Sequence, residues 1–319
     1  MSDPRGADAE KLRALRELIP ATGAGIYLDT ATRGPLPAET AAAMRDADDW
    51  ELRVGRATEG RAEDMEQRLE EARAVLAALL VADPSQIIVT HGATDALGRL
   101  ASAAGDRHVE IIPHVDPNTG TLTRLPRSLE ADRLVALDAT LSVGAVPLAA
   151  ADLGVDAVAF SADRWLLGPE TTGGLWLGPR VGHAVQPELG RSAVLGLARS
   201  VGWLEMYVGL DWAYQRTMLN VHRLRDALAA TPGVELVTPA EMVAVVCFAI
   251  PAWPLDEALA ELRRRAFAII GPTPEGRLVR ASVAWFNTDE EIDRFAAAVA
   301  EIARHTPDSL PRRPPLIVR

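Results

Sequence analysis

Short apolar runs alternate with amphipathic segments along most of this chain. Runs of about four to eight apolar residues bounded by turn residues predict buried strands. Such runs occupy 108–115, 133–139, 156–162 and 173–178. Apolar residues spaced three or four positions apart predict helices with one buried face, and this spacing occurs at 62–81, 255–266 and 288–305. The alternation predicts a mostly parallel sheet covered by helices.

Further segments complete a two-part organisation. The stretch 85–105 predicts a strand, a tight glycine turn and a helix, and 25–37 predicts a short strand that runs into a Gly/Pro turn. Thr288 and Glu291 have the spacing of a capping box at a helix start. The remaining expected elements are a helix at 9–19 and strands at 233–238, 242–250 and 277–285. In chain order, the expected units are an N-terminal helical arm (1–24), a large α/β domain (25–198), a connecting helix (199–230), a small α+β domain (231–306) and an irregular tail (307–319).

Composition and charge narrow the classes of function. The 319 residues carry a net charge of −11, which argues against a nucleic-acid or anionic-membrane surface because phosphates need a basic face. The single cysteine excludes an intramolecular disulfide and a cysteine-cluster metal site, and the six histidines lack metal-ligand spacing. No apolar run reaches membrane-spanning length, and the N-terminus lacks the apolar core of a signal peptide. We expect a cytoplasmic protein with no metal, no nucleic-acid partner and no membrane contact.

The stretch THGATDAL places a glycine turn at a predicted helix start. The free N–H groups of such a turn and the positive end of the helix dipole favour an anion, and the Thr94 hydroxyl adds a donor. The plainer alternative is that Thr94 or Asp95 caps the helix. The turn taken alone favours capping.

Three other residues stand out on predicted strands. Asp138 ends an apolar strand, where ligands bind in open α/β sheets, unless it only starts a turn. Arg280 lies in an apolar strand and needs a partner, either a substrate carboxylate or an internal acid. Cys247 lies inside the apolar stretch VVCFAI and is expected to be a small core residue.

Several stretches, taken in order, resemble the class V aminotransferase family of pyridoxal-phosphate (PLP) enzymes. This family includes cysteine desulfurases, C–S lyases and isopenicillin-N-epimerase-like proteins. The matching stretches are GIYLDTATRGPLP, IIVTHGATDAL, PHVDPNTG, residues 134–178, ARSVGWLEMYVGLDW and VRASVAWFNTDEEID. The resemblance implies fold type I of the PLP-dependent transferases (aspartate-aminotransferase-like), with a shortened large domain and a small C-terminal domain. It also implies a dimer with sites at the subunit interface.

The resemblance assigns roles to the residues that match the family's motifs. Ala93 and Thr94 match the phosphate-binding turn, and Ser161 matches the serine that contacts the phosphate. Asp138 matches the aspartate that keeps the pyridine nitrogen protonated. Arg280 matches the arginine that binds the substrate's α-carboxylate.

The chain departs from the family where the cofactor is held. Arg164 replaces the lysine that forms the Schiff base, and a guanidinium does not lose its proton to form one. Lys11 is the only lysine in the chain, and it lies too far upstream to be a convincing substitute. Leu141 stands where the family usually has a polar residue near the phenolic oxygen, and Asp163 stands where a histidine is common.

A segment present in the family is missing from this chain near 105–109. The family has several dozen residues between the counterparts of LASAAGD and VEIIPHV, including the side chain that stacks on the cofactor ring. The loop IIGPTPEGR also lacks the nucleophilic cysteine that a desulfurase needs. A truncated gene would explain the deletion but not Arg164.

These departures favour a degenerate class V aminotransferase-like protein that forms no internal aldimine with PLP. It would act as a non-catalytic or PLP-independent scaffold, as a homodimer or as a heterodimer with a catalytic paralogue. One alternative is an active enzyme on an amino acid (C–S lyase, epimerase or aminotransferase) that holds PLP or its amine form non-covalently. Another is a small-anion binding protein whose cationic pocket contains Arg164, Thr94 and Arg280. No residue is assigned as catalytic, because Arg164 occupies the position of the lysine.

Overall fold

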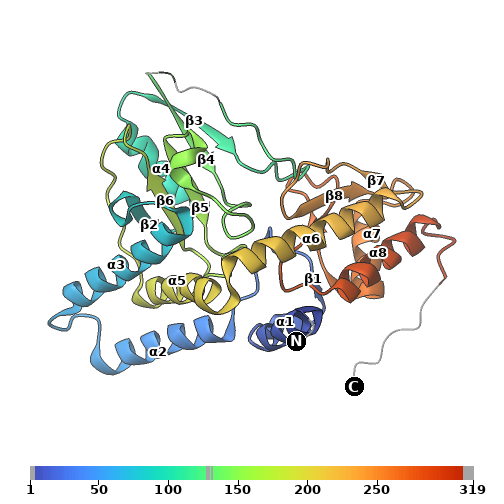
Figure 1. Cartoon of the computed structure of the whole chain (residues 1–319), viewed down its shortest axis with the longest axis horizontal. Helices are drawn as coiled ribbons and strands as arrows, with labels where there is room; N and C mark the ends of the chain where they lie inside the picture. The colour runs from blue at the N-terminus through green and yellow to red at the C-terminus, as the bar shows by residue number, and fades with distance from the viewer. Residues whose placement is uncertain (1–3, 127–129, 131, 312–319) are drawn as a thin grey trace.

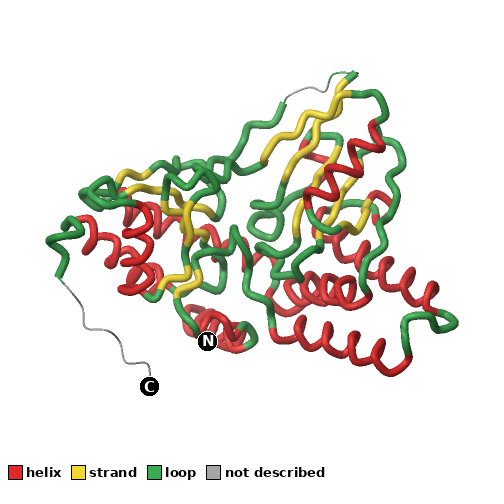
Figure 2. The backbone as a smooth tube through the Cα atoms, turned by 180° about the vertical axis from the view of Figure 1, so that it is seen from behind, coloured by secondary structure: helices red, strands yellow, loops and turns green. Residues whose placement is uncertain are grey.

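The computed structural model describes residues 4–126, 130 and 132–311. Its strands fall into two main groups, and the long helix α6 (Leu210–Ala229) runs from one to the other (Figure 1). Figure 2 shows the same two groups of strands from behind. The first is a five-stranded sheet and the second a four-stranded sheet. Within the described ranges, no helix is long and apolar enough to cross a membrane.

The five-stranded sheet forms the centre of the larger part. In spatial order its strands are β2 (Ile87–Thr90), β6 (Gly173–Leu177), β5 (Ala157–Ser161), β4 (Arg133–Asp138) and β3 (His108–Pro113). The pairs β3–β4 and β4–β5 are parallel, whereas β6 pairs antiparallel with both β5 and β2. All strands except β6 therefore run in one direction, and the predicted mostly parallel sheet is confirmed.

Helices cover both faces of this sheet. Val135 and Leu137 of β4 belong to the core shared with α3 (Arg61–Leu80) and α5 (Arg191–Trp203). Ala136, between them, belongs to a second core formed with α4 (Ala93–Ala104). Because alternate side chains of a strand point to opposite faces, burial on both faces produces the continuous apolar runs seen in the sequence.

Two features of this part differ from expectation. β3 was expected to be buried, but it is the edge strand of the sheet, and its Ile111 side chain is 51% exposed. The helix α2 (Ala38–Val54), which packs against α5, was not predicted. Its sequence is rich in alanine and aspartate and has few large apolar residues to reveal a helical period.

The segment predicted as one connecting helix over 199–230 is helical but broken. α5 ends at Trp203, a turn of π-helix covers Leu204–Val208, and α6 begins at Leu210. Gly209 lies between them with φ = 79°, a conformation that glycine adopts at little cost. The apolar spacing continues through this break, so the period alone could not reveal it.

The smaller part is an antiparallel sheet packed on helices. Its strands in spatial order are β10 (Gly271–Pro272), β11 (Val279–Ser282), β8 (Val245–Ala249) and β7 (Glu235–Leu236). Its helices are α7 (Leu255–Ala266) and α8 (Asp289–Ala303). The predicted capping box is confirmed, since Thr288 and Glu291 each accept the other's backbone N–H at 3.1 Å. The strands are shorter than predicted.

The N-terminal arm packs beside this smaller part. It contains α1 (Pro4–Glu17) and leads into β1 (Ile26–Tyr27), which pairs in parallel with β9 (Ala268–Ile269). Short 3₁₀ turns occur at Pro20–Gly23, Pro84–Gln86 and Ala150–Leu153. Most of the predicted irregular tail, from 312 onward, lies outside the described residues.

Candidate functional site

A cavity of about 320 Å³ lies at the carboxyl ends of the parallel strands. Asp138 is the last residue of β4, Arg164 follows β5, and Arg280 comes from β11 of the smaller sheet. The cavity is lined by Ala31, Thr32, Pro113, Val115, Pro117, Asp138, Thr140, Leu141, Arg164, Pro274 and Arg280. The structure thus brings together three of the predicted site residues, and it leaves Ala93, Thr94 and Ser161 outside the lining.

The glycine turn before α4 is bonded internally. Gly92 has φ = 114°, and the Ala93 N–H donates to the Ser161 hydroxyl at 3.0 Å. Thr94 is exposed, while the Asp95 carboxylate accepts the His91 N–H at 3.0 Å. Of the two capping candidates, Asp95 is therefore the one that bonds the turn.

A chain of hydrogen bonds links this turn to the cavity. The Ser161 N–H donates to the Thr140 hydroxyl at 3.3 Å, and the Thr140 N–H donates to Oδ1 of Asp138 at 3.0 Å. Asp138 therefore starts a turn and also faces the cavity. Its other carboxylate oxygen has no hydrogen bond within the described part of the chain, so it is free to accept one from a ligand.

Arg164 is held by the residue before it. Its Nη1 donates to Oδ2 of Asp163 at 2.7 Å, while its Nε is buried without a partner among the described residues. The backbone carbonyl of Asp163 accepts the Gly34 N–H at 2.7 Å, which fixes the loop against the chain that follows β1. The guanidinium is thereby oriented by an acid at its side and retains unused donors.

Arg280 is the more deeply buried of the two arginines. Its side chain is 8% exposed, its Nη2 donates to the Thr32 hydroxyl at 2.7 Å, and Oδ1 of Asp29 lies 3.8 Å away. Burial, together with the nearby positive charge of Arg164, lowers the pKa of Arg280, whereas Asp29 opposes that shift. Burial likewise raises the pKa of Asp29, although Thr32 and Arg280 pull it down. Asp29 is thus the internal acid foreseen as a partner of Arg280, at a distance too long for a hydrogen bond.

Lys11 lies elsewhere. Its Nζ is 4.3 Å from the centre of the Trp212 ring, in a cation–π contact between α1 and α6. The centre of the Trp212 ring lies 5.8 Å from the centre of the Trp285 ring, and neither tryptophan lines the cavity. Lys11, the only lysine of the chain, therefore does not line the candidate site.

These residues do not fit a covalently held PLP. Within the described part of the chain no amine lines the cavity, the guanidinium at the matched position is bonded to Asp163, and the apolar Leu141 occupies a wall position. The Ser161 hydroxyl, matched to a phosphate contact, accepts the Ala93 N–H and keeps its own O–H as a donor. The cavity lining instead carries two guanidinium groups and one carboxylate.

His114, which the sequence did not single out, lies next to this site. Its Nδ1 is 2.8 Å from the Ser142 hydroxyl, and its backbone N–H donates to the Asp138 carbonyl at 2.8 Å. The flanking residues Pro113 and Val115 line the cavity. Thr32 and Thr140 were also missed, although both lie inside stretches that resemble the family. His114 lies between two lining residues without lining the cavity itself, and no pattern in the sequence marks such a position.

The burial of His114 has a measurable consequence for stability. Burial lowers the pKa of His114 below its usual value, so the unfolded chain takes up a proton at a higher pH than the folded chain. The free energy of unfolding should then fall as the pH drops below about 6.5, by up to about 1.4 kcal/mol per pH unit. Urea unfolding at pH 7.5 and 5.5 should show that His114→Gln loses this part of the pH dependence. His222→Gln, at an exposed position, should keep it, and equal slopes in all three proteins would contradict the assignment.

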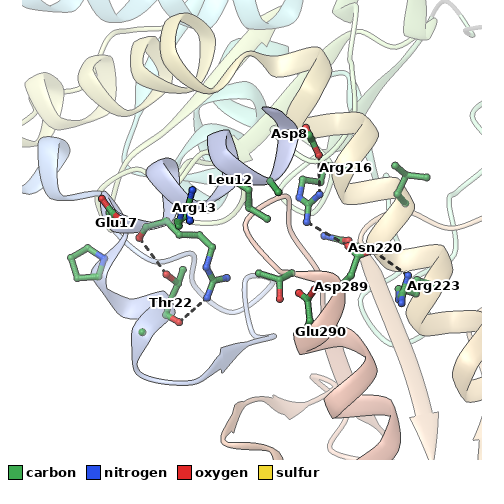
Figure 3. A pocket seen from close by; sticks show the side chains of 16 residues that line it. Asp8, Leu12, Arg13, Glu17, Thr22, Arg216, Asn220, Arg223, Asp289 and Glu290 are labelled. Atoms are coloured by element: carbon green, nitrogen blue, oxygen red, sulfur yellow. Dashed lines mark hydrogen bonds and ion pairs between the residues drawn. The ribbon is translucent and has the colours of Figure 1, made fainter. Parts of the chain in front are cut away.

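A larger cavity, of about 1200 Å³, lies between α1, α6 and the start of α8 (Figure 3). Arg16, Arg216 and Arg223 in its lining are already bonded to acids or to backbone carbonyl oxygens, and the fourth arginine, Arg13, is exposed. No lining side chain has a buried polar atom without a partner among the described residues, in contrast to Arg164 and Arg280. The smaller cavity is therefore the better candidate site despite its size.

Comparisons with known proteins agree with the fold. Residues 26–112 match the family model described as aminotransferase class V. Isopenicillin N epimerase from Amycolatopsis lactamdurans is 25% identical over 258 residues, an alignment that spans 67% of this chain and 65% of that protein, slightly under two thirds of its length. The resemblance to the class V aminotransferase family is thereby confirmed.

Solved structures resemble most of this chain. A mutant of C-DES, a cystine C–S lyase, with glycine covalently linked to its PLP cofactor has a TM-score of 0.75 and 18% identity, and the match covers 89% of this chain and 98% of that one. The apo cysteine desulfurase of Thermococcus onnurineus NA1 has a TM-score of 0.73 and 18% identity, with 95% and 99% covered. At this identity the likeness concerns the fold. The predicted type I fold of PLP-dependent transferases is confirmed.

Proposed function

We propose that this class V aminotransferase-like chain is a cytoplasmic protein that works without a covalent bond to PLP, as a non-catalytic or PLP-independent subunit. The observation that carries the proposal is the pairing of Arg164 with Asp163 at the position matched to the Schiff-base lysine. A lysine there supplies both the covalent anchor and the proton shuttle at the substrate. A guanidinium supplies neither at neutral pH, because it stays protonated.

The proposed role is structural or regulatory. The chain would pair with itself or with a lysine-bearing paralogue, because the family it resembles forms dimers with sites at the subunit interface. Mass measurement in solution tests the homodimer, and co-purification with such a paralogue tests the heterodimer. A monomer that binds no paralogue would contradict the scaffold role.

The covalent chemistry is tested directly with PLP. The purified protein is incubated with PLP, reduced with borohydride, digested and analysed by mass spectrometry. We expect no PLP adduct on Lys11, because its side chain lies over Trp212 rather than in the cavity. Lys11→Arg, which has no side-chain amine, is the matched control. An adduct on Lys11 that accompanies turnover of an amino acid would overturn the proposal, and so would turnover with non-covalent PLP.

A second candidate function, small-anion binding, is favoured by the state of the two arginines. Within the described residues, Arg164 and Arg280 each donate one hydrogen bond, and the Nε of each is buried without a partner. The other terminal nitrogen of each guanidinium makes no hydrogen bond within the described residues, so an anionic ligand in the cavity would be stabilised by accepting from it. Thr94, which was expected to contribute, is exposed and lies outside the cavity lining. We therefore propose a pocket of Arg164 and Arg280 alone.

A further inference from the structure

We propose that the 115–122 hairpin is a lid on the cavity, which opens as one piece and then exposes Cys247 to water. The hairpin follows β3, and a single β-bridge between Val115 and Leu122 closes its base. Val115 and Pro117 line the cavity, and the chain after β3 reaches across to the smaller sheet near β8 (Figure 1). This inference goes beyond the functions proposed above, because it concerns the way into the cavity rather than its occupant.

The hairpin is held together by its own hydrogen bonds. Oδ1 of Asp116 accepts the N–H groups of Asn118 and Thr119 at 2.8 and 3.0 Å. The Asp116 carbonyl accepts the Gly120 N–H at 2.8 Å, and the Asp116 N–H donates to the Thr121 carbonyl at 2.9 Å. Because these bonds close within the hairpin, they remain when it separates from the smaller part, so the segment can move as a rigid piece.

Two exposed hydrogen bonds join the hairpin to a loop of the smaller part. The side-chain oxygen of Asn118 accepts the Glu275 N–H at 3.2 Å, and its side-chain nitrogen donates to Oε1 of Glu275 at 3.3 Å. Each bonded residue is next to a proline of the cavity wall, Pro117 on the hairpin and Pro274 on the loop. The Asn118–Glu275 pair therefore holds two walls of the cavity together.

The hairpin is also attached to the smaller sheet by polar contacts. The Thr238 hydroxyl donates to the Thr119 carbonyl at 2.6 Å and accepts the Cys247 N–H at 2.7 Å. A single β-bridge joins Thr121 to Met242. Each such contact contributes a modest net free energy, because water replaces the lost bond when the contact opens. We therefore expect the hairpin to open at a much lower cost than global unfolding.

Cys247 lies beside the place where the hairpin docks, and it is the only cysteine of the chain. Its side chain is fully buried, and the charge of Asp116 on the hairpin acts on its thiol. Burial raises the pKa of the thiol to about 12, which Arg280 and Thr238 only partly oppose. Little reactive thiolate therefore forms while the hairpin is in place, whereas an exposed thiol has a pKa of about 8.5.

Alkylation of Cys247 tests the lid on the intact protein. The rate at which iodoacetamide modifies the chain is measured by mass spectrometry at several urea concentrations below the unfolding transition. We expect a rate that hardly depends on urea in this range, because opening of a short hairpin exposes little new surface. Labelling through global unfolding would instead rise steeply with urea, with the slope of the equilibrium transition.

Variants assign the opening to the contacts of the hairpin. Asn118→Ala removes both bonds to Glu275 and should raise the urea-independent rate at least about fivefold. Glu275→Gln keeps the backbone N–H and a side-chain acceptor, so its rate should stay near that of the unmodified chain. Gln67→Ala is the matched control, since it removes an exposed amide–carboxylate bond of 3.4 Å to Glu71 on α3, and it should change nothing.

A second variant acts on the other attachment. Gly120 has φ = 75°, and a Cβ there would collide with the carbonyl oxygen of Val245 on β8, so Gly120→Ala should lift the hairpin and speed labelling as well. Circular dichroism and urea unfolding check that each variant folds. The inference is wrong if every protein is labelled only with the urea slope of global unfolding, or if Asn118→Ala and Gly120→Ala are labelled no faster than Gln67→Ala.

Discussion

Replacing Trp285 by alanine is expected to lower the free energy of unfolding by about 3–5 kcal/mol. The Trp285 side chain is 1% exposed, and its ring lies 6.0, 5.8 and 5.5 Å from the rings of Trp203, Trp212 and Phe286. These partners belong to α5, to α6 and to the segment before α8, so one ring joins the large part, the connecting helix and the small part. The truncation would leave a cavity where all three meet, and equilibrium urea unfolding measures the loss.

Two other substitutions define what this result means. Trp285→Phe retains an aromatic ring and removes an indole N–H that is buried without a partner among the described residues, so it should cost less than half as much as the alanine. Leu219→Ala, on the exposed face of α6 (71% exposed), should change stability by no more than about 0.5 kcal/mol. If Trp285→Ala lowered the free energy of unfolding no more than Leu219→Ala, the packing of Trp285 against its aromatic neighbours would not stabilise the place where the large part, the connecting helix and the small part meet.

The fold was predictable where burial is complete. β4 and β5 lie inside the sheet, so nearly every position is apolar and the runs mark both strands close to their observed bounds. α2 was missed because its buried positions include Thr40 and Ala47, which do not contrast with the exposed alanines and aspartates around them. The exposure of β3 was missed because an edge strand with apolar side chains has the same pattern as a buried one.

The candidate site was predictable in its members but not in its contacts. Asp138 was found because a carboxylate after an apolar strand lies at the ligand-binding edge of a parallel sheet. Arg164 and Arg280, 116 positions apart, were singled out by matched motifs and by the cost of burying an arginine, and the fold places both on one cavity. No pattern predicts that Ser161 accepts the Ala93 N–H, or that Asp163 rather than a ligand holds Arg164. Such contacts depend on distances between loops that lie far apart in sequence.

Gly173→Ala is expected to cost about 3 kcal/mol or more, because the added Cβ has no room on either side. It would lie 2.2 Å from the carbonyl oxygen of Phe160 and 2.7 Å from the Cα of Gly92, and both are backbone atoms that cannot rotate away. Gly173 pairs with Ser161 on β5 and with Thr90 on β2, directly before the glycine turn. The methyl group would therefore push the turn away from the sheet that holds it. Overpacking against backbone is among the costlier single changes, and urea unfolding measures it.

The same substitution at Gly98 is the matched control. Gly98 lies inside α4, the helix that follows the turn, and a Cβ there meets nothing within 4 Å. Alanine is favoured over glycine in a helix by about 0.5–1 kcal/mol, so Gly98→Ala should stabilise the protein. If the added methyl group destabilises the protein at Gly173 and stabilises it at Gly98, the backbone contacts of Gly173 with Phe160 and Gly92 are the cause. If Gly173→Ala were as stable as the unmodified chain, the Gly92 turn would not be packed against β6, and the position from which the Ala93 N–H donates to Ser161 would not depend on that packing.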